Sequence, residues 1–342
     1  MVAPPAERRS LPAALAAGFT ADPARWLLKA RSPLVKWRTG VDLLGWPRGD
    51  AAAAALWGRR HDDADLAAVL SARGGDGLWR EGSRFYGRRF HLMLPRYRAA
   101  LWQLPLLADL GLTLEEPAAC DAAAAFFVRR AADGFFDLGP GEPSVFGNAL
   151  AASALARLGA PPAELGGVRR WLAGRQRRDG GWADRRELAD EDAPSVVATT
   201  AEVVRALAGD GDAAVVAARA GGVRYLRDNL FTDYNGRFPP SAAPWTRLGW
   251  PQYHYDALSV ATALAAAGAS RADVAPLADA VRALETRRGF WRQQAVAGGD
   301  YWLAPVRAGR ASRWVTFRAA FFLVWYFGAL PENDCGATCY LL

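Results

Sequence analysis

The sequence predicts an all-α protein built from roughly five to six helical hairpins. Runs rich in Ala, Leu and Val with helical periodicity fill most of the 342 residues, and short turns with a glycine before an aromatic residue recur between them. Alternating Val, Ile and Thr runs, which are typical of strands, are nearly absent, and the chain has no Ile at all. Such hairpins either stack into an open solenoid or close into a ring.

Five glycine-aromatic turns mark the repeat. Their first glycines are separated by 57, 46, 56 and 53 residues. Each interval has room for two helices. The turns contain Gly77-Leu78-Trp79, Gly134-Phe135-Phe136, Gly180-Gly181-Trp182, Gly236-Arg237-Phe238 and Gly289-Phe290-Trp291.

Helix start and stop signals agree with this spacing. Asp22 and Ser32 each precede a proline, as N-caps do, and Gly159 and Gly268 follow periodic runs, as residues after a helix end do. The expected helices cover residues 23–30, 33–45, 97–112, 117–132, 144–158, 161–175, 195–208, 213–229, 253–267, 272–286 and 312–328.

We expect one domain over residues 1–342, with N-terminal helices in 1–60, the repeats in 61–328 and a tail in 329–342. The tail ends in Cys339-Tyr340-Leu341-Leu342, which resembles a prenylation box. The alternatives are a local disulfide with Cys335 and an ordinary tail. Three cysteines in all form no disulfide framework and predict a reducing, cytoplasmic compartment.

The chain has 42 basic residues against 35 acidic ones, which gives a net charge of +7. Of the basic residues, only Lys29 and Lys36 are not arginine. Arginine used in place of lysine, together with abundant alanine, indicates GC-rich coding, so the charge does not predict a nucleic-acid partner. The longest apolar stretch, 319–330, is too short to span a bilayer. It is either core or a patch that contacts a membrane from one side. No pattern indicates the oligomeric state.

The 14 tryptophans are the unusual feature of the composition. The stretch Gln176–Trp182 resembles the Q-x-x-D-G-x-W repeat of squalene and oxidosqualene cyclases and of protein prenyltransferase β-subunits, and Asp76–Trp79 is a shorter match. This resemblance implies an α/α toroid, a ring of concentric helices. It also implies that Trp79, Trp182 and Trp291 pack on helix ends as structural residues.

The resemblance to cyclases raises the question of the acid that starts the reaction. The frame of the D-x-D-D motif fits residues 196–207, but Val196, Ala198 and Thr199 stand where the acids belong. Asp190 and Asp192, in the loop just upstream, are candidate acids. The alternative is that they form a polar N-terminal region favoured by the helix dipole.

The zinc site of the prenyltransferases has no counterpart in the sequence. No Cys-x-His spacing occurs, and the three histidines are scattered. We therefore expect no metal and no cofactor.

The segment 245–256 offers a better acid. A helix beginning near Pro251 would present Asp256 to a cavity mouth, beside His254 and Tyr255. An apolar pocket raises the pKa of a carboxyl group and keeps it protonated, so Asp256 is the candidate acid. The alternative is that the amides of the first helical turn satisfy its carboxylate.

Aromatic rings and arginines complete the candidate site. Ring faces stabilise carbocations by roughly 0.5–2 kcal/mol each, and arginine beside an aromatic ring suits a diphosphate or carboxylate head with an apolar tail. The alternative for the arginines is a solvated face. The candidate substrate-binding residues are Tyr97, Trp102, Trp245, Trp250, Tyr253, Trp314, Arg96, Arg247 and Arg313.

The resemblance and these residues together predict a small, metal-independent cyclase of bacterial secondary metabolism. It would fold an apolar isoprenoid or polyene-like substrate in an aromatic cavity and start cyclisation by protonation from one carboxylic acid. The alternative is a non-catalytic toroid that binds a lipid-like ligand or a protein partner.

Overall fold

A computed structural model describes residues 9–79, 92–94, 96–184, 194–232, 243–253, 255–296 and 298–328. Within these residues the fold is all-α, and the only β-type pairings are two isolated bridges, Arg130 with Phe136 and Arg292 with Ala311. The α-helices are α1 (Ala13–Ala16), α2 (Pro23–Leu27), α3 (Pro33–Arg38), α4 (Ala51–Gly58), α5 (Ala64–Ser71), α6 (Ala100–Asp109), α7 (Pro117–Phe127), α8 (Val145–Arg157), α9 (Pro162–Ala173), α10 (Val197–Ala206), α11 (Ala213–Asp228), α12 (Ala243–Thr246), α13 (Ala257–Ala266), α14 (Arg271–Ala283) and α15 (Arg313–Tyr326). A π-helical turn, Thr39–Leu43, continues α3, and a short 3₁₀ helix, Arg60–Asp62, precedes α5.

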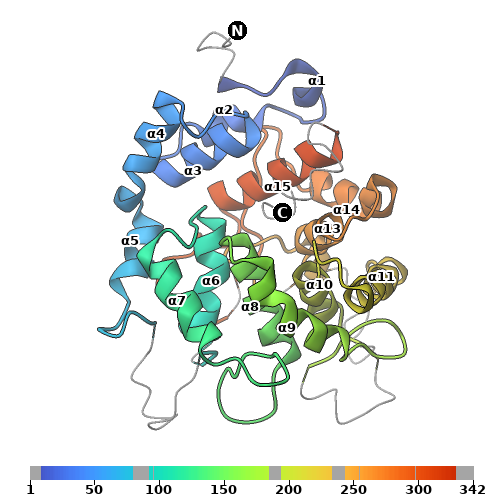
Figure 1. The fold of residues 1–342 in the computed structure, drawn as a ribbon. Coiled ribbons are helices and arrows are strands. Elements are labelled where there is room, and N and C mark those ends of the chain that lie inside the picture. The colour runs from blue at the N-terminus through green and yellow to red at the C-terminus, as the bar shows by residue number, and fades with distance from the viewer. Residues whose placement is uncertain are drawn as a thin grey trace.

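The helices form two concentric layers around a ring (Figure 1). Helices α6, α8, α10, α13 and α15 pack on one another in sequence, and α15 returns to α2 and α3. Outside them, α7, α9, α11 and α14 each pack on the inner helix of their own hairpin. The predicted toroid is confirmed.

Burial distinguishes the two layers. Every residue of α13 is buried, and α8 is buried along almost its whole length, whereas α9, α11 and α14 bury only one face. An inner helix touches both its neighbours and an outer helix, so it is apolar all round. The small alanine side chains of α8 and α13 allow these inner helices to pack closely against their neighbours.

Three of the glycine-aromatic turns are fixed to the preceding helix by the same hydrogen bond. The indole N–H of Trp79 donates to Val69 O at 2.6 Å, that of Trp182 to Leu172 O at 2.7 Å and that of Trp291 to Val281 O at 2.7 Å. All three rings are fully buried, and each acceptor lies ten residues before its tryptophan. These tryptophans are structural, as the sequence predicts.

A polar side chain near the start of the next inner helix accepts a hydrogen bond from the backbone of the glycine-aromatic turn. The backbone N–H of Trp182 donates to Thr200 Oγ1 and that of Trp291 to Thr316 Oγ1, both at 2.9 Å. The backbone N–H of Phe136 donates to Asn148 Oδ1 at 2.7 Å. The acceptor is the fourth residue of its helix each time. The turn at Gly236 lies outside the described residues.

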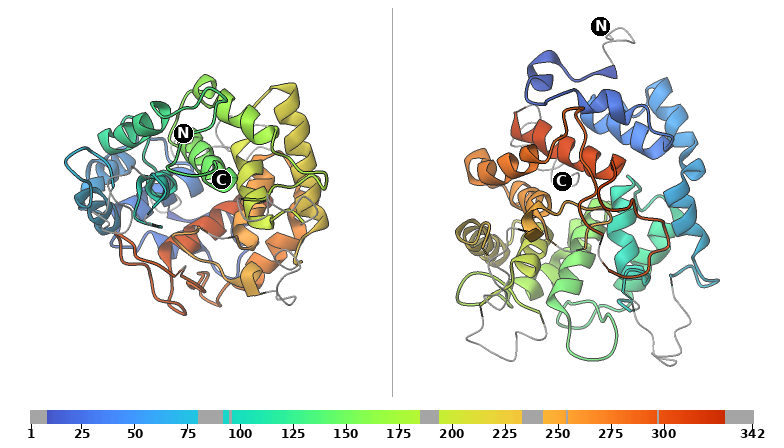
Figure 2. Two further views of the ribbon diagram at one scale, coloured as in Figure 1. Left: turned by 90° about the horizontal axis from the view of Figure 1, so that it is seen from below. Right: turned by 180° about the vertical axis from the view of Figure 1, so that it is seen from behind.

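Contacts between the first and last helices close the ring. The Arg313 guanidinium donates to the carbonyl oxygen of Trp26 and lies over its indole, 3.4 Å from the ring centroid. On the other side, Arg38 Nη1 donates to Asp109 O at 2.7 Å and so joins α3 to α6. Figure 2 shows that the segment between α14 and α15 crosses the ring on the face opposite that of Figure 1.

One expected helix is wrong at its start. We expected helix from residue 253, but α13 begins at Ala257, and the described residues 251–253 and 255–256 are not helical. The reason is a capping box: Asp256 accepts from the Ser259 N–H, and the Ser259 hydroxyl accepts from the Asp256 N–H, both at 2.7 Å. These two bonds satisfy the first free amides and fix the start of the helix.

The apolar stretch that begins at Ala319 is part of the core. Residues 319–325 of α15 are buried. In the part of the chain that the structure describes, no helix is long and apolar enough to cross a bilayer.

Replacing Gly289 with alanine tests the ring closure. Gly289 has φ +71°, and a Cβ there would lie inside van der Waals contact with the carbonyl oxygen of Ala21, just before α2. Gly209 also has φ +71°, but a Cβ there meets nothing within 4 Å. Both Gly→Ala variants therefore carry the same left-handed strain, about 1–2 kcal/mol, and only Gly289→Ala adds a clash.

We expect Gly289→Ala to lose about 2 kcal/mol or more beyond the loss of Gly209→Ala in denaturant unfolding. Equal losses in the two variants would show that the N-terminal segment does not pack on the last turn.

Candidate functional site

A small enclosed cavity lies at the centre of the ring. Residues from α3, α6, α8, α10, α13 and α15, with the segment before α13, form its wall. The space open to the centres of water-sized molecules is about 60 Å³, enough for a few waters or one small polar group. The apolar part of the wall includes Leu150, Phe146, Phe317 and Phe321.

The polar part of the wall is dominated by charge. Four arginines, Arg38, Arg157, Arg205 and Arg318, share it with two carboxylates, Asp109 and Glu202. Two of these arginines, Arg157 and Arg205, lie in the last turns of inner helices, where the negative end of the helix dipole favours a cation.

Asp109, at the end of α6, connects several of these groups. Its carboxylate accepts from Arg157 Nη2 at 2.5 Å and from the Trp250 indole at 2.9 Å. Burial raises the pKa of Asp109, but the arginines Arg157 and Arg318 outweigh burial and leave this pKa below its usual value. Asp109 is therefore ionised at neutral pH.

Arg205 ties α10 to α13. It donates to Glu202 Oε2 at 2.9 Å, to Ser259 O at 2.6 Å and to Thr262 Oγ1 at 2.9 Å. Burial lowers the pKa of Arg205, Glu202 raises it, and the neighbouring arginines lower it further. The arginines at the centre of the ring thus repel one another.

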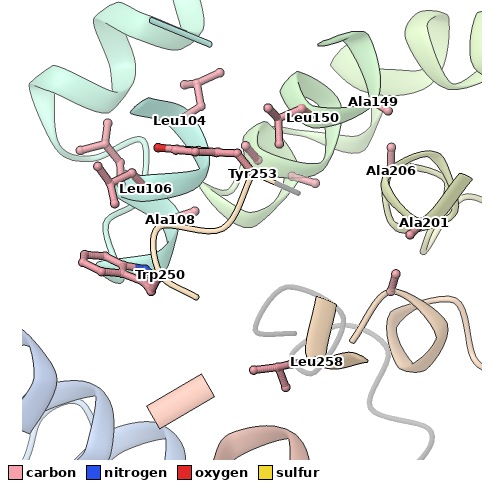
Figure 3. Packing of buried hydrophobic residues seen from close by; sticks show 14 of the residues in the cluster. Leu104, Leu106, Ala108, Ala149, Leu150, Ala201, Ala206, Trp250, Tyr253 and Leu258 are labelled. Carbon is pink, nitrogen blue, oxygen red and sulfur yellow. The ribbon is translucent and has the colours of Figure 1, made fainter. Parts of the chain in front are cut away.

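Aromatic side chains close the cavity at the end where the inner helices begin. The rings of Tyr97, Tyr253 and Tyr301 are nearly parallel, with Tyr97 4.9 Å from Tyr253 and 5.1 Å from Tyr301. Trp102 meets Tyr97 and Tyr253 edge-on, and the Tyr253 hydroxyl donates to Trp102 O at 2.8 Å. Figure 3 shows Tyr253 between Leu104 of α6 and Leu150 of α8. Tyr97, Trp102 and Tyr253 thus come together as one cluster.

Asp256 lies one hydrogen bond behind the cavity wall. It is fully buried, and the amide of Gln252, a wall residue, donates to its second oxygen. Burial raises the pKa of Asp256, although Arg318 and the hydrogen bonds from Ser259 oppose this. Amides of the first turn do hold its carboxylate, and the same group is a buried acid beside the cavity. Its role as an acid stays a prediction.

Trp250 and Trp314 link the cavity to a second carboxylate. Their rings stack with centroids 5.0 Å apart; Trp250 donates to Asp109 and Trp314 donates to Asp65 Oδ2 at 3.1 Å. Burial raises the pKa of Asp65 to about 6, with the Trp314 hydrogen bond opposing it. Both indoles are buried against protein groups.

Of the other predicted residues, only Tyr255 lines the cavity among those that the structure describes. Trp245 packs edge-on against Tyr255 at 5.2 Å. Arg313 lies on Trp26, and Arg96 and Arg247 are exposed. Asp190, Asp192 and His254, like the Cys335 and Cys339 tail, are outside the residues that the structure describes.

The charged residues of the cavity were not among the predicted site residues. A usable signal was present, because the otherwise apolar helices α6 and α8 each carry one charge, Asp109 and Arg157, and α15 carries Arg318 in its middle; all three lie in the wall. A charged side chain on a helix that is buried on every side must reach a polar environment. Among the described residues no group of three or more His, Cys, Asp or Glu could hold a metal ion.

Comparison with known proteins gives structural neighbours only. No family model matches the chain, and no curated protein matches it. The type II terpene cyclase MstE from Scytonema, in its apo form, aligns with a TM-score of 0.39 and 14% identity over 77% of this chain and 96% of its own. A variant of that cyclase in complex with its product, merosterolic acid A, gives 0.39 and 14% over 78% and 96%. At this TM-score the alignment assigns no role to any residue here.

The raised pKa of Asp65 predicts a pH-dependent stability. The folded chain binds this proton more tightly than the unfolded chain, whose Asp pKa is near 3.8. The contribution of Asp65 to the unfolding free energy is therefore fully present below pH 4 and is lost as the pH rises through about 6. Asp65→Asn removes the charge and keeps an oxygen for the Trp314 indole.

We expect Asp65→Asn to be roughly 1–3 kcal/mol more stable than the wild type at pH 8 and nearly equal to it at pH 4. Denaturant unfolding at the two pH values measures this. The control is Asp62→Asn, which removes an exposed carboxylate nearby. A gain in Asp65→Asn that is the same at both pH values would contradict the proposed desolvation.

Proposed function

We propose that the protein is a terpenoid-cyclase-like enzyme that acts on an isoprenoid or polyene-like substrate, with Asp256 as the initiating acid. The observation that carries the proposal is a fully buried carboxyl group with a raised pKa, one hydrogen bond behind the wall of an enclosed cavity at the centre of the ring. A carboxylic acid kept neutral by burial is the group that protonates an alkene.

The surroundings of Asp256 suit this role. Gln252 and Ser259 both line the cavity and both donate to Asp256, so the acid lies directly behind the wall, and the Gln252 side chain has to move aside for the acid proton to reach an alkene. Release of its proton leaves a carboxylate, and the Ser259 amide, the Gln252 amide and the positive charge of Arg318 stabilise that anion.

The aromatic residues lie where a cation would form. Tyr253 and Tyr255 directly precede α13, next to Asp256, and both line the cavity. A carbocation is attracted by ring faces and repelled by guanidinium groups. In this proposal the reacting alkene therefore lies at the aromatic end and the other end of the substrate lies toward the arginines. Because the cavity is small, an isoprenoid substrate also requires the side chains at the aromatic end to move apart.

A second candidate function is a non-catalytic toroid that binds a lipid-like ligand. One observation favours it: the aromatic cluster of Tyr97, Trp102, Tyr253 and Tyr301 is packed against itself and fills the end of the cavity. Turnover distinguishes the two functions.

The test compares wild type and Asp256→Asn with a panel of linear polyprenyl diphosphates and polyenes, with products identified by mass spectrometry and NMR. Asparagine also caps helices, so the variant keeps the start of α13 but has no acidic proton to give. We expect the rate to fall at least ~100-fold, the size of a lost general acid.

The control is Asp184→Asn, another capping substitution, because Asp184 accepts from the Val145 N–H at 2.9 Å at the start of α8. Wild-type turnover by Asp256→Asn would remove Asp256 as the acid. Absence of turnover by the wild type with every substrate would favour the binding protein.

A further inference from the structure

The four arginines of the central cavity are only partly neutralised by the protein. Arg38 forms a buried ion pair with Asp42, Arg157 pairs with Asp109, and Arg205 pairs with Glu202. Arg318 has no ion pair within the described part of the chain. Arg318 is half-buried, and a charge partly removed from water is normally paired, because losing its hydration is costly.

The remaining contacts of Arg318 do not offset its charge. It lies in the middle of α15, away from the helix end whose dipole favours cations. To the described residues it donates one hydrogen bond, from Nη1 to Gly249 O at 3.2 Å, whereas a guanidinium has five N–H donors. Within the described part of the chain, Arg318 thus has both unused hydrogen-bond donors and a charge without an ion-pair partner.

Two acids, Asp109 and Asp256, lie near enough to interact with the charge of Arg318, but Asp109 forms its ion pair with Arg157 and Asp256 does not act as a counterion. Its two oxygens accept from the Ser259 amide and the Gln252 side chain, and no ion pair joins it to Arg318. Burial raises its pKa even though Arg318 opposes this, so burial disfavours the charged form that a counterion needs.

Two neighbouring guanidiniums are also incompletely satisfied. The Nε atoms of Arg157 and Arg205 are buried and have no hydrogen-bond partner among the residues that the structure describes. Since buried polar groups are almost always partnered, such gaps indicate a water or ion that belongs to the native site.

We propose that the central cavity binds a singly charged oxyanion, a carboxylate, with Arg318 as its main partner. The ligand is expected to carry one negative charge because, among the described residues, three of the four cavity arginines have a carboxylate partner and Arg318 does not. A carboxylate matches the forked donors of a guanidinium, and a group of this size fits the cavity. A multiply charged anion is disfavoured, since Asp109 and Glu202 share the wall.

A second hollow lies on the other side of two of these arginines. Arg38 and Arg157 belong to the walls of both hollows, and the wall of the second also includes Asp42 and the exposed Arg48. Positive charge therefore extends beyond the central cavity.

The apolar part of the wall indicates what the carboxylate is attached to. Leu150, Phe317 and Phe321 lie beside the arginines, so a hydrocarbon chain adds contacts that a free small anion lacks. The site does not depend on the proposed reaction. If that proposal also holds, the carboxylate anchors the end of the substrate that does not react.

The test is calorimetric titration of the full chain with acetate, octanoate, octan-1-ol and pyrophosphate, with thermal unfolding as a second readout. We expect octanoate to bind and to raise Tm, and to bind at least ~10-fold more weakly to Arg318→Gln, the size of one lost charged hydrogen bond. Arg224→Gln, which removes an exposed arginine on the outer helix α11, should bind as the wild type does.

Ala198→Leu is a second variant, in case Arg318→Gln does not fold. Ala198 lines the cavity and is half-buried, so leucine there fills space without removing a charge, and octanoate binding should fall. Binding of acetate with the same dependence on Arg318 also supports the site and assigns it to a free anion.

The proposal is overturned if octanoate does not bind, if it binds equally to the wild type and both cavity variants, if octan-1-ol binds as tightly, or if pyrophosphate binds more tightly. Because binding is measured without turnover, this result is separate from the outcome for Asp256→Asn.

Discussion

The hydrogen bond from a buried tryptophan indole to the carbonyl oxygen ten residues earlier is the interaction on which the ring depends. It occurs at Trp79, Trp182 and Trp291, and each time it joins the end of an outer helix to the turn that leads inward. A single helical hairpin buries little apolar surface, so it needs a fixed angle to stack on its neighbours. The indole supplies both the polar contact and the large buried ring that set this angle.

The position of the inner helices then determines what the centre can contain. Each inner helix is surrounded by protein, so its charged side chains can point only into the central cavity or pair with a neighbouring helix. Arg38 and Arg205 pair with neighbours and join helices across the ring. Among the described residues, Arg318 donates one hydrogen bond, to the Gly249 carbonyl oxygen, and has no counterion. The same geometry that closes the ring therefore concentrates positive charge at its centre, while the aromatic residues gather at the end where the helices begin.

Periodicity and turn chemistry predicted most helices to within a few residues, because both are local. The largest differences are the end of α7, which lies at Phe127 and not at residue 132, and the start of α13: residues 253–267 have helical periodicity throughout, but the Asp256–Ser259 capping box begins the helix at Ala257. The spacing of the aromatic residues in the sequence did not predict which of them line the cavity. Tyr253 and Tyr255 line the cavity, whereas Trp250 and Trp314 stack on each other and donate to Asp109 and Asp65.

The sequence by itself determined the all-α class, the hairpin repeat and the structural role of the turn tryptophans, since these follow from periodicity, glycine in left-handed turns and a recurring residue pattern. Only the tertiary structure decided which side chains meet at the centre. Asp109 and Arg318 are separated by most of the repeats in the chain, yet both belong to one cavity wall, because the ring closes through α3, which packs on α15 and hydrogen-bonds the end of α6. Contacts of this kind depend on how distant helices pack, and no local pattern encodes them.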